Sequence, residues 1–226
     1  MTREALNRAE YRNTDLAELI QPECDLVHEY VEDAKQIGGR ALEVGPGNGR
    51  SVAYLLQNGF TVDVIDNDAE VISILETNLI SAHVDCAKLR LDVLDVQRWK
   101  PTSQIYAFIS ISHVLHFLDS SLAMEVLCTL SRGLLSGGLI LIRVHSTEHP
   151  AAQSKVVSGV TFFRISDFDW LQRSGFTLVH SAVVKSYNSR RSAMQRAKAN
   201  GREGDADAIA YFTGLGGHIE LLLRKD

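Results

Sequence analysis

The feature that most constrains the fold is a glycine-rich turn at residues 43–50, with the sequence EVGPGNGR. It follows a strand-like run at 40–44 and precedes a helical pattern that begins at Arg50. Closely spaced glycines give the backbone conformational freedom and let it approach a ligand closely. A helix that begins at such a turn also offers N–H groups without intrahelical partners. The turn therefore predicts a strand–turn–helix unit that binds a nucleotide-like cofactor.

Strand-like and helical segments alternate on both sides of this turn. Segment 105–111, IYAFISI, is too continuously apolar to leave one face in water, as expected for a buried parallel strand. Predicted strands cover 40–44, 61–66, 88–92, 105–111 and 139–145, and predicted helices cover 50–57, 68–79 and 120–135. Repeated strand–helix units predict a parallel sheet with helices on both faces, which is an α/β three-layer sandwich.

The C-terminal third departs from this repetition. A helix is predicted at 166–173, followed by strands at 177–184 and 219–224. No helical segment of clear core character separates the last two strands, so an antiparallel pair is favoured. Residues 185–217 between them are basic and then acidic, and a connection of this length is typical of a lid or binding loop.

We therefore expect one domain over residues 1–226. Apolar residues recur at helical spacing over 15–37, with a break at Pro22. The expected divisions are an N-terminal helical cap at 1–37, a cofactor-binding core at 38–184, an insertion or lid at 185–217 and a final strand at 218–226.

Composition narrows the class of protein. With 226 residues, 45% hydrophobic and 23% charged, the chain is typical of a soluble globular domain. Its net charge of -5 argues against a dedicated nucleic-acid binder, which needs a basic excess to neutralise phosphates. Cys24, Cys86 and Cys128 form no CxxC pair, which fits a reducing cytoplasm. Because no apolar leader and no apolar run near ~20 residues is found, we predict a cytoplasmic protein without a membrane anchor.

Acidic residues follow two successive predicted strands. Asp66 ends the second strand, where a carboxylate can accept hydrogen bonds from both ribose hydroxyls of a cofactor. Asp92 ends the third strand and could accept from an adenine amino group, with the Val93 N–H meeting a ring nitrogen. Arg50 stands where a dinucleotide fingerprint has its third glycine. Together these details favour S-adenosylmethionine (SAM) over NAD.

On these motifs the chain resembles the class I SAM-dependent methyltransferases over about residues 41–145. The motifs are LEVGPGNG at 42–49, VID at 64–66, LDV at 91–93, SHVLHFL at 112–118 and LLSGG at 134–138. The resemblance implies a Rossmann-like methyltransferase fold with a seven-stranded, mostly parallel sheet whose last strand is antiparallel. It also implies SAM as cofactor and S-adenosylhomocysteine (SAH) as product.

The resemblance assigns roles to individual positions. Asp66 binds ribose, Asn67 lies beside adenine, and Ser112 lines the methionine side. Asp92 and Val93 bind adenine, and Tyr11 belongs to the acceptor pocket. The residues that border the methionine part are Glu43, Gly45, Pro46, Gly47 and Gly49. A narrower likeness to tellurite-resistance methyltransferases rests on GNGR at 47–50, NGF at 58–60 and the Phe162-Phe163 pair.

Three histidines are candidates on the acceptor side. His113 follows the fourth strand at the ligand face of the sheet, and we interpret it either as a general base or as a packing residue. Residues 145–149 match the metallopeptidase motif HxxEH, but that motif requires a helix, whereas this segment follows a strand and precedes Pro150. His145 and His149 are therefore candidates for the acceptor pocket. The fourth strand ends without the aspartate of catechol-type enzymes, so we predict no metal.

The sequence narrows the class of methyl acceptor but does not identify the acceptor molecule. Tyr187, Arg190 and Arg191 form either a solvated helix or a lid that binds an anion, because guanidinium groups suit carboxylate or oxyanion geometry. The chain has no Pro-Pro-aromatic motif for base amino methylation and no Pro-Cys nucleophile. We predict transfer to a small molecule, an anion being one option, at an O, N, S or chalcogen atom. The alternatives are an NAD-dependent oxidoreductase and a non-catalytic SAM-binding protein, and the sequence predicts no oligomeric state.

Overall fold

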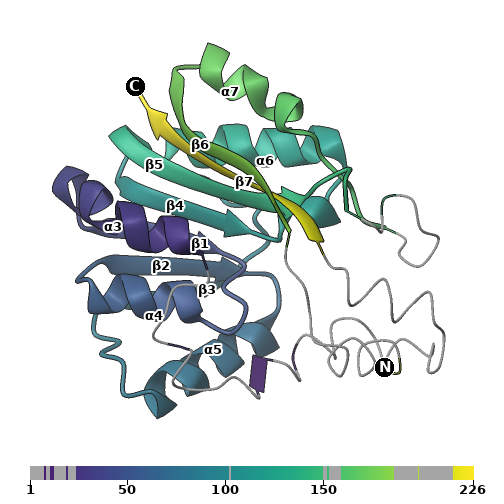
Figure 1. Cartoon of the computed structure of the whole chain (residues 1–226). Coiled ribbons are helices and arrows are strands. Elements are labelled where there is room, and N and C mark those ends of the chain that lie inside the picture. The colour runs from purple at the N-terminus through teal and green to yellow at the C-terminus, as the bar shows by residue number, and fades with distance from the viewer. Residues whose placement is uncertain are drawn as a thin grey trace.

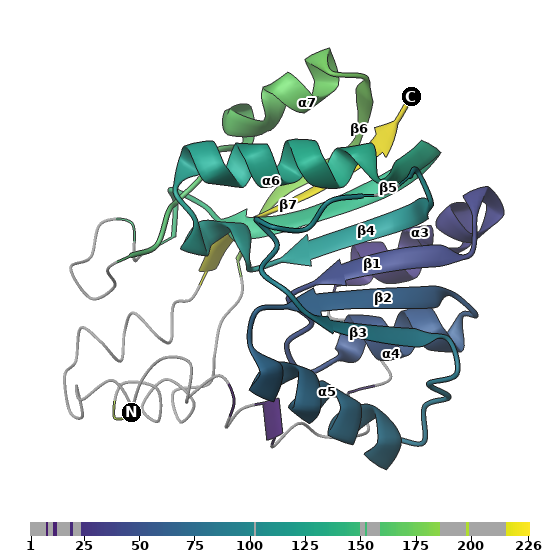
Figure 2. The same cartoon turned by 180° about the vertical axis from the view of Figure 1, so that it is seen from behind.

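A computed structural model of the chain describes residues 24–101, 103–149, 159–185 and 216–226, together with residues 8, 11, 12, 19, 152 and 198. Seven strands in this part form one sheet in the order β3-β2-β1-β4-β5-β7-β6. Helices cover both faces of the sheet, as Figures 1 and 2 show from opposite sides. The predicted α/β three-layer sandwich is therefore confirmed.

The strands agree closely with the segments predicted from sequence. They are β1 (Arg40–Val44), β2 (Thr61–Asp66), β3 (Leu89–Val93), β4 (Tyr106–Ser112), β5 (Leu134–His145), β6 (Phe176–Lys185) and β7 (Gly216–Lys225). Strands β1 to β5 pair in parallel. Strand β7 lies between β5 and β6 and is antiparallel to both, so the prediction of an antiparallel last strand is confirmed.

Alternate residues of the strands feed two separate apolar cores. Leu139 and Leu141 of β5 pack on the side of α3, α4 and α5, whereas Ile140 and Ile142 pack on the side of α6 and α7. This double burial explains the continuous apolar runs of the central strands. The helices are α3 (Asp25–Ile37), α4 (Arg50–Gln57), α5 (Ala69–Ser81), α6 (Ser120–Arg132) and α7 (Asp169–Arg173), with the short 3-10 helices η1 (Leu115–Phe117) and η3 (Ile165–Phe168).

One predicted boundary was wrong. The helix expected over 120–135 ends at Arg132, and β5 already begins at Leu134, which pairs with Tyr106. Gly133 ends the helix because its N–H donates to Leu130 O, while its own carbonyl accepts from the N–H of Tyr106. Gly137 and Gly138, which directly follow the expected helix in the sequence, therefore lie inside β5, where the register with β4 is irregular.

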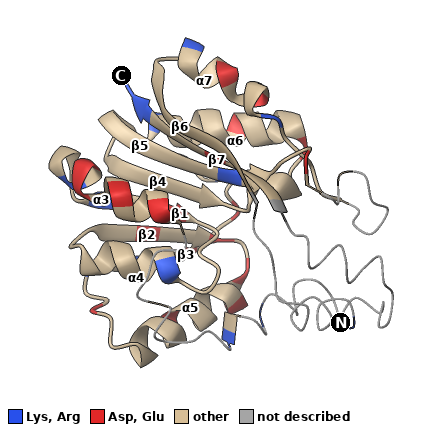
Figure 3. Cartoon of the chain, viewed as in Figure 1, with Lys and Arg blue, Asp and Glu red and all other residues tan. Residues whose placement is uncertain are grey.

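Two further observations bear on partners. On the face seen in Figure 3, several acidic residues lie on α3, and the basic residues are scattered. The described residues therefore form no continuous basic surface in that view. No helix in the described ranges has the length and apolar character needed to cross a membrane. The expected insertion at 185–217 and the expected cap before residue 24 lie almost wholly outside the described residues.

Candidate active site

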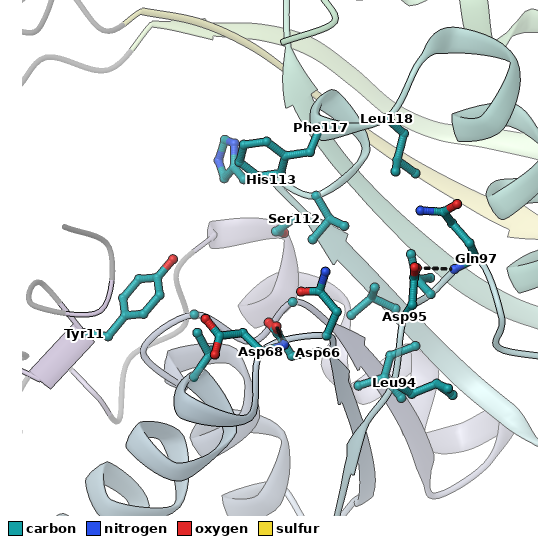
Figure 4. Close-up of a pocket in the computed structure, with 18 of the residues that line it drawn as sticks. Tyr11, Asp66, Asp68, Leu94, Asp95, Gln97, Ser112, His113, Phe117 and Leu118 are labelled. Atoms are coloured by element: carbon teal, nitrogen blue, oxygen red, sulfur yellow. Dashed lines mark hydrogen bonds between the residues drawn. The ribbon is translucent and has the colours of Figure 1, made fainter. Parts of the chain in front are cut away.

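A cavity of about 800 Å³ opens at the carboxyl ends of β1, β2 and β4. Its volume lies within the ~300–1,000 Å³ typical of small-molecule and cofactor sites. Strands β1 and β4 are neighbours in the sheet, and the chain runs from β1 to β2 on one side and from β4 to β5 on the other. Such a switch point is where open α/β sheets bind ligands. Figure 4 shows the side chains that line this cavity.

The glycine turn after β1 forms one wall of the cavity. At two of its glycines, φ is positive and a side chain would also clash with its surroundings. Gly45 has φ of 71°, its N–H donates to Ile65 O at 2.9 Å, and a Cβ there would lie 2.3 Å from Val114 Cγ2. Gly49, the N-cap of α4, has φ of 98°, and a Cβ there would lie 2.4 Å from Leu75 Cδ1. Tight packing behind the turn therefore brings the N-terminus of α4 to the cavity.

Replacing Gly45 with alanine is expected to destabilise the fold by about 2–4 kcal/mol, because left-handed strain and overpacking against Val114 add. Gly59→Ala is the matched control, since Gly59 also has positive φ, of 86°, but has open space around it. It should show the strain alone, about 1–2 kcal/mol. Adding Val114→Ala to Gly45→Ala should recover part of the loss in urea unfolding. Equal losses for both glycine variants would contradict the packing argument.

Asp66 lies in the cavity at the end of β2, as predicted. Its Oδ1 accepts the N–H of Asp68 at 2.8 Å, which orients the carboxylate. Burial raises the pKa of Asp66 above its ordinary value. Asp68 caps α5 through a hydrogen bond from the Glu70 N–H and forms an ion pair with Arg8 at 2.6 Å, which holds the pKa of Asp68 below its ordinary value. The predicted ribose-binding carboxylate is thus held rigidly, with Asn67 beside it in the cavity.

The end of β3 differs from the sequence-based assignment. Asp92 and Val93 do not line the cavity, and Val93 is 57% exposed on β3. The cavity is reached by the residues that follow the strand, Leu94, Asp95, Val96 and Gln97. Asp95 Oδ1 accepts the Gln97 N–H at 2.9 Å, as the dashed line in Figure 4 shows. The acidic side chain that this segment places in the cavity is therefore that of Asp95, three residues beyond Asp92.

The opposite end of the cavity is formed by the loop after β4. Ser112 and His113 line it, and Phe117 and Leu118 extend it (Figure 4). His113 has φ of 58°, an uncommon conformation for a residue with a side chain, and its N–H donates to Arg143 O at 2.8 Å. The backbone of β5 therefore fixes the point at which His113 enters the cavity.

His113 is one of five histidines gathered behind this end of the cavity. Its ring centroid lies 5.7 Å from that of His145, 5.8 Å from that of His116 and 5.4 Å from that of His218. The His145 centroid lies 4.0 Å from His116 and 4.6 Å from His149. His145 and His149 are not among the cavity-lining residues, so the structure brings them to His113 rather than to the cavity itself.

Two of these histidines, His113 and His149, have pKa values below the ordinary range. Burial lowers the pKa of His113 well below its ordinary value, and the neighbouring Arg143 guanidinium acts in the same direction. Burial also lowers the pKa of His149 to about 4. Residues 145–149 form a strand end and a turn rather than a helix, so the HxxEH geometry is not present. Pro150 lies outside the described residues.

The other predicted residues lie around the cavity or outside the described ranges. Glu43 is buried in β1 and accepts a hydrogen bond from Ser110 Oγ at 3.2 Å. It does not line the cavity, and neither do Pro46 and Gly49, whereas Gly45 and Gly47 do. Tyr11 lines the cavity opposite Gly47, whose added Cβ would lie 3.6 Å from the Tyr11 ring. The predicted acceptor residues Tyr187, Arg190 and Arg191 lie outside the described residues.

The sequence analysis did not identify one residue, Asn78, that connects the N-terminal segment to the glycine turn. Asn78 of α5 is buried, and its side-chain amide donates to Tyr11 O at 3.0 Å and to Asn48 O at 3.1 Å. It thereby joins the N-terminal segment to the glycine turn. The only signal in the sequence was a polar residue on the apolar side of a predicted helix.

Comparison with known proteins identifies the family. The sequence model described as "Methyltransferase domain" matches residues 9–181, which is more than half of the chain. The chain belongs to the class I SAM-dependent methyltransferases. No curated protein sequence matched this methyltransferase.

Solved structures agree with this methyltransferase in fold. The N-methyltransferase NodS from Bradyrhizobium japonicum WM9, in complex with SAH, has 13% identity, 97% coverage of both chains and a TM-score of 0.63. Magnesium protoporphyrin IX methyltransferase from Synechocystis PCC 6803, with bound SAH, has 11% identity, 99% and 95% coverage and a TM-score of 0.69. TehB from Haemophilus influenzae has 16% identity, 88% and 62% coverage and a TM-score of 0.62. At these identities the similarity concerns the fold, so the likeness to TehB does not identify an acceptor.

Proposed function

We propose that this methyltransferase transfers a methyl group from SAM to a small molecule that enters beside His113 and Phe117. The observation that carries the proposal is one cavity that joins two groups of residues. Gly47, Asp66 and Asn67 come from the turns after β1 and β2, and Ser112 and His113 come from the end of β4 and the loop after it. A cofactor and its acceptor would therefore meet within the same walls.

The cavity residues fit SAM in kind and position. The glycine turn lines the cavity at Gly45 and Gly47, the Asp66 carboxylate suits the ribose hydroxyls, and Asp95 suits the adenine amino group. SAM, when bound, supplies a methyl group on a positively charged sulfonium. Arg50 also lines the cavity, and its side chain has room there because the turn ends at Gly49. We assign Asp95 the adenine contact that sequence reasoning gave to Asp92 and Val93.

The chain's task in the reaction is alignment and exclusion of water. Methyl transfer from a sulfonium is an in-line displacement, so the acceptor atom must be held opposite the leaving sulfur. Phe117, 48% exposed beside the cavity, and Tyr11 offer aromatic surface for this purpose. Because the low pKa of His113 makes its imidazole a weak proton acceptor, we assign His113 a contact with the acceptor rather than proton abstraction.

Calorimetry with SAM, SAH and NAD tests the proposal. SAM and SAH should bind, and NAD should bind at least about tenfold more weakly. Incubation with SAM and pools of small molecules should then release SAH in the presence of one acceptor class. Preferential NAD binding would favour the oxidoreductase alternative. SAM binding without SAH formation from any pool would favour the non-catalytic alternative.

A further inference from the structure

The five histidines behind the cavity come from separate segments that the sheet brings together. His113 and His116 belong to the loop after β4, and His145 ends the neighbouring strand β5. His218, near the start of β7, pairs with His145 in the antiparallel register. Strand β7 therefore delivers its histidine to the place where β5 ends, although the two residues are far apart in sequence.

Three of these histidines have the arrangement of a metal site. His113, His116 and His145 each offer one ring nitrogen, and the three nitrogens all lie within 4.8 Å of one another. Nitrogens around a tetrahedral zinc ion, at ~2.0–2.1 Å from the metal, lie about 3.3 Å apart. The difference is at most about 1.5 Å, which side-chain rotation can close. Among the described residues, no other group of three or more His, Cys, Asp or Glu side chains has ligand atoms this close together.

The backbone around the three residues is held by specific hydrogen bonds. The Thr161 N–H donates to His116 O at 2.8 Å, and the Phe163 N–H donates to His145 O at 2.9 Å. His113 is held through its N–H on Arg143 O. A third, sequence-distant segment thus connects the two strand ends. Such support keeps candidate ligands in place before an ion arrives.

The charges around the cluster permit a cation. Arg143 lies beside the cluster, and its Nη2 lies 3.2 Å from His218 Nε2. Its charge is balanced by Glu220, whose Oε1 lies 3.0 Å from Arg143 Nε and 3.1 Å from His218 Nε2. The Arg143 guanidinium acts on His113, but the Arg143–Glu220 ion pair is neutral overall, which reduces its repulsion of a cation at the three imidazoles.

We propose that His113, His116 and His145 form a binding site for a divalent first-row transition metal ion such as Zn²⁺. Imidazole is a suitable ligand for Zn²⁺, Ni²⁺ and Cu²⁺. Three protein ligands leave a fourth position for water or substrate. His113 also lines the cavity, so the ion would lie at the cavity wall on the acceptor side. The proposal opposes the sequence-based expectation of no metal, which rested on a missing aspartate alone.

The test is metal binding by the full chain after treatment with EDTA, measured without SAM or acceptor. Calorimetry with Zn²⁺ should show a single tight site. Co²⁺ should give the intense visible absorption of a four-coordinate ion. His116→Ala and His145→Ala should each weaken Zn²⁺ binding by at least about tenfold. His28→Ala is the matched control, because His28 is an exposed histidine outside the cluster, on α3.

Circular dichroism and thermal unfolding check that each variant is folded. If a variant does not fold, X-ray absorption of the zinc-loaded parent protein decides, since the proposal requires nitrogen ligands of imidazole type at ~2.0–2.1 Å. Zn²⁺ binding no stronger in the parent than in His145→Ala would overturn the proposal, and so would an oxygen-only shell. Because none of these measurements uses SAM, their outcome is independent of the proposed methyl transfer.

Discussion

Replacing Asp66 with alanine is expected to weaken SAM binding by about tenfold to a hundredfold. A carboxylate that accepts hydrogen bonds from two ribose hydroxyls contributes about 1.5–3 kcal/mol through such charged bonds. The Asp68 N–H already orients the Asp66 carboxylate, so little ordering cost remains when a ligand binds. Calorimetric Kd values for SAM and SAH, measured with parent and variant, check the result.

Two controls separate ribose binding from damage to the fold. Asp66→Asn keeps the shape and one acceptor oxygen and should lose less affinity than Asp66→Ala. Glu76→Ala removes an exposed carboxylate from α5 and should leave SAM affinity unchanged. Thermal unfolding of each variant shows whether loss of the Asp66–Asp68 hydrogen bond loosens the start of α5. Unchanged SAM affinity in a folded Asp66→Ala protein would refute the assignment.

Acidification from pH 6.5 towards pH 4 is expected to destabilise the metal-free protein steeply. The pKa of His149 falls from about 6.5 in the unfolded chain to about 4 in the fold, and the pKa of His113 is lowered further. In this range the unfolded chain binds more protons than the folded chain, so stability falls as pH falls. Each such histidine adds up to about 1.4 kcal/mol per pH unit. Urea unfolding at several pH values in EDTA measures the slope.

The carboxylates of Asp68 and Glu220 do not cause a loss of stability in the same pH range. The pKa values of Asp68 and Glu220 are lowered in the fold, so their stabilising effect is present above the ordinary carboxyl range and is lost only below about pH 4.5. His149→Asn should reduce the slope above that pH, with His28→Gln as the control for loss of a histidine at an exposed position. A stability that stays constant between pH 6.5 and 4.5 would show that the buried histidines do not remain neutral.

Local patterns in the sequence predicted most of the fold because the relevant physics is local. Short strand-like apolar segments located β1, β2 and β4 to within a residue, and the helical pattern from 68 located the start of α5. The end of α6 was missed because LLSGG can close a helix or begin a strand, and the choice depended on pairing between Leu134 and Tyr106. Pairing with a distant strand leaves no local trace.

The residues of the candidate site also differ in whether local sequence patterns could predict them. The glycine turn and Asp66 were predicted because a βα turn and the end of the next strand always meet at the ligand edge of a parallel sheet. The place of Asp95 in the cavity was not predicted, because it depends on the path of the chain after β3. Asn78 was missed because its partners, Tyr11 and Asn48, are distant in sequence.

The sequence by itself determined the α/β class, the glycine turn and its carboxylate, since each follows from short-range periodicity and backbone sterics. Only the tertiary structure decided that five histidines from the loop after β4, the end of β5 and the start of β7 share one place. That gathering depends on the insertion of β7 between β5 and β6 in antiparallel register, which sets His218 opposite His145. Strand order and register are properties of the whole sheet, because a strand pairs with whichever edges the rest of the fold leaves available.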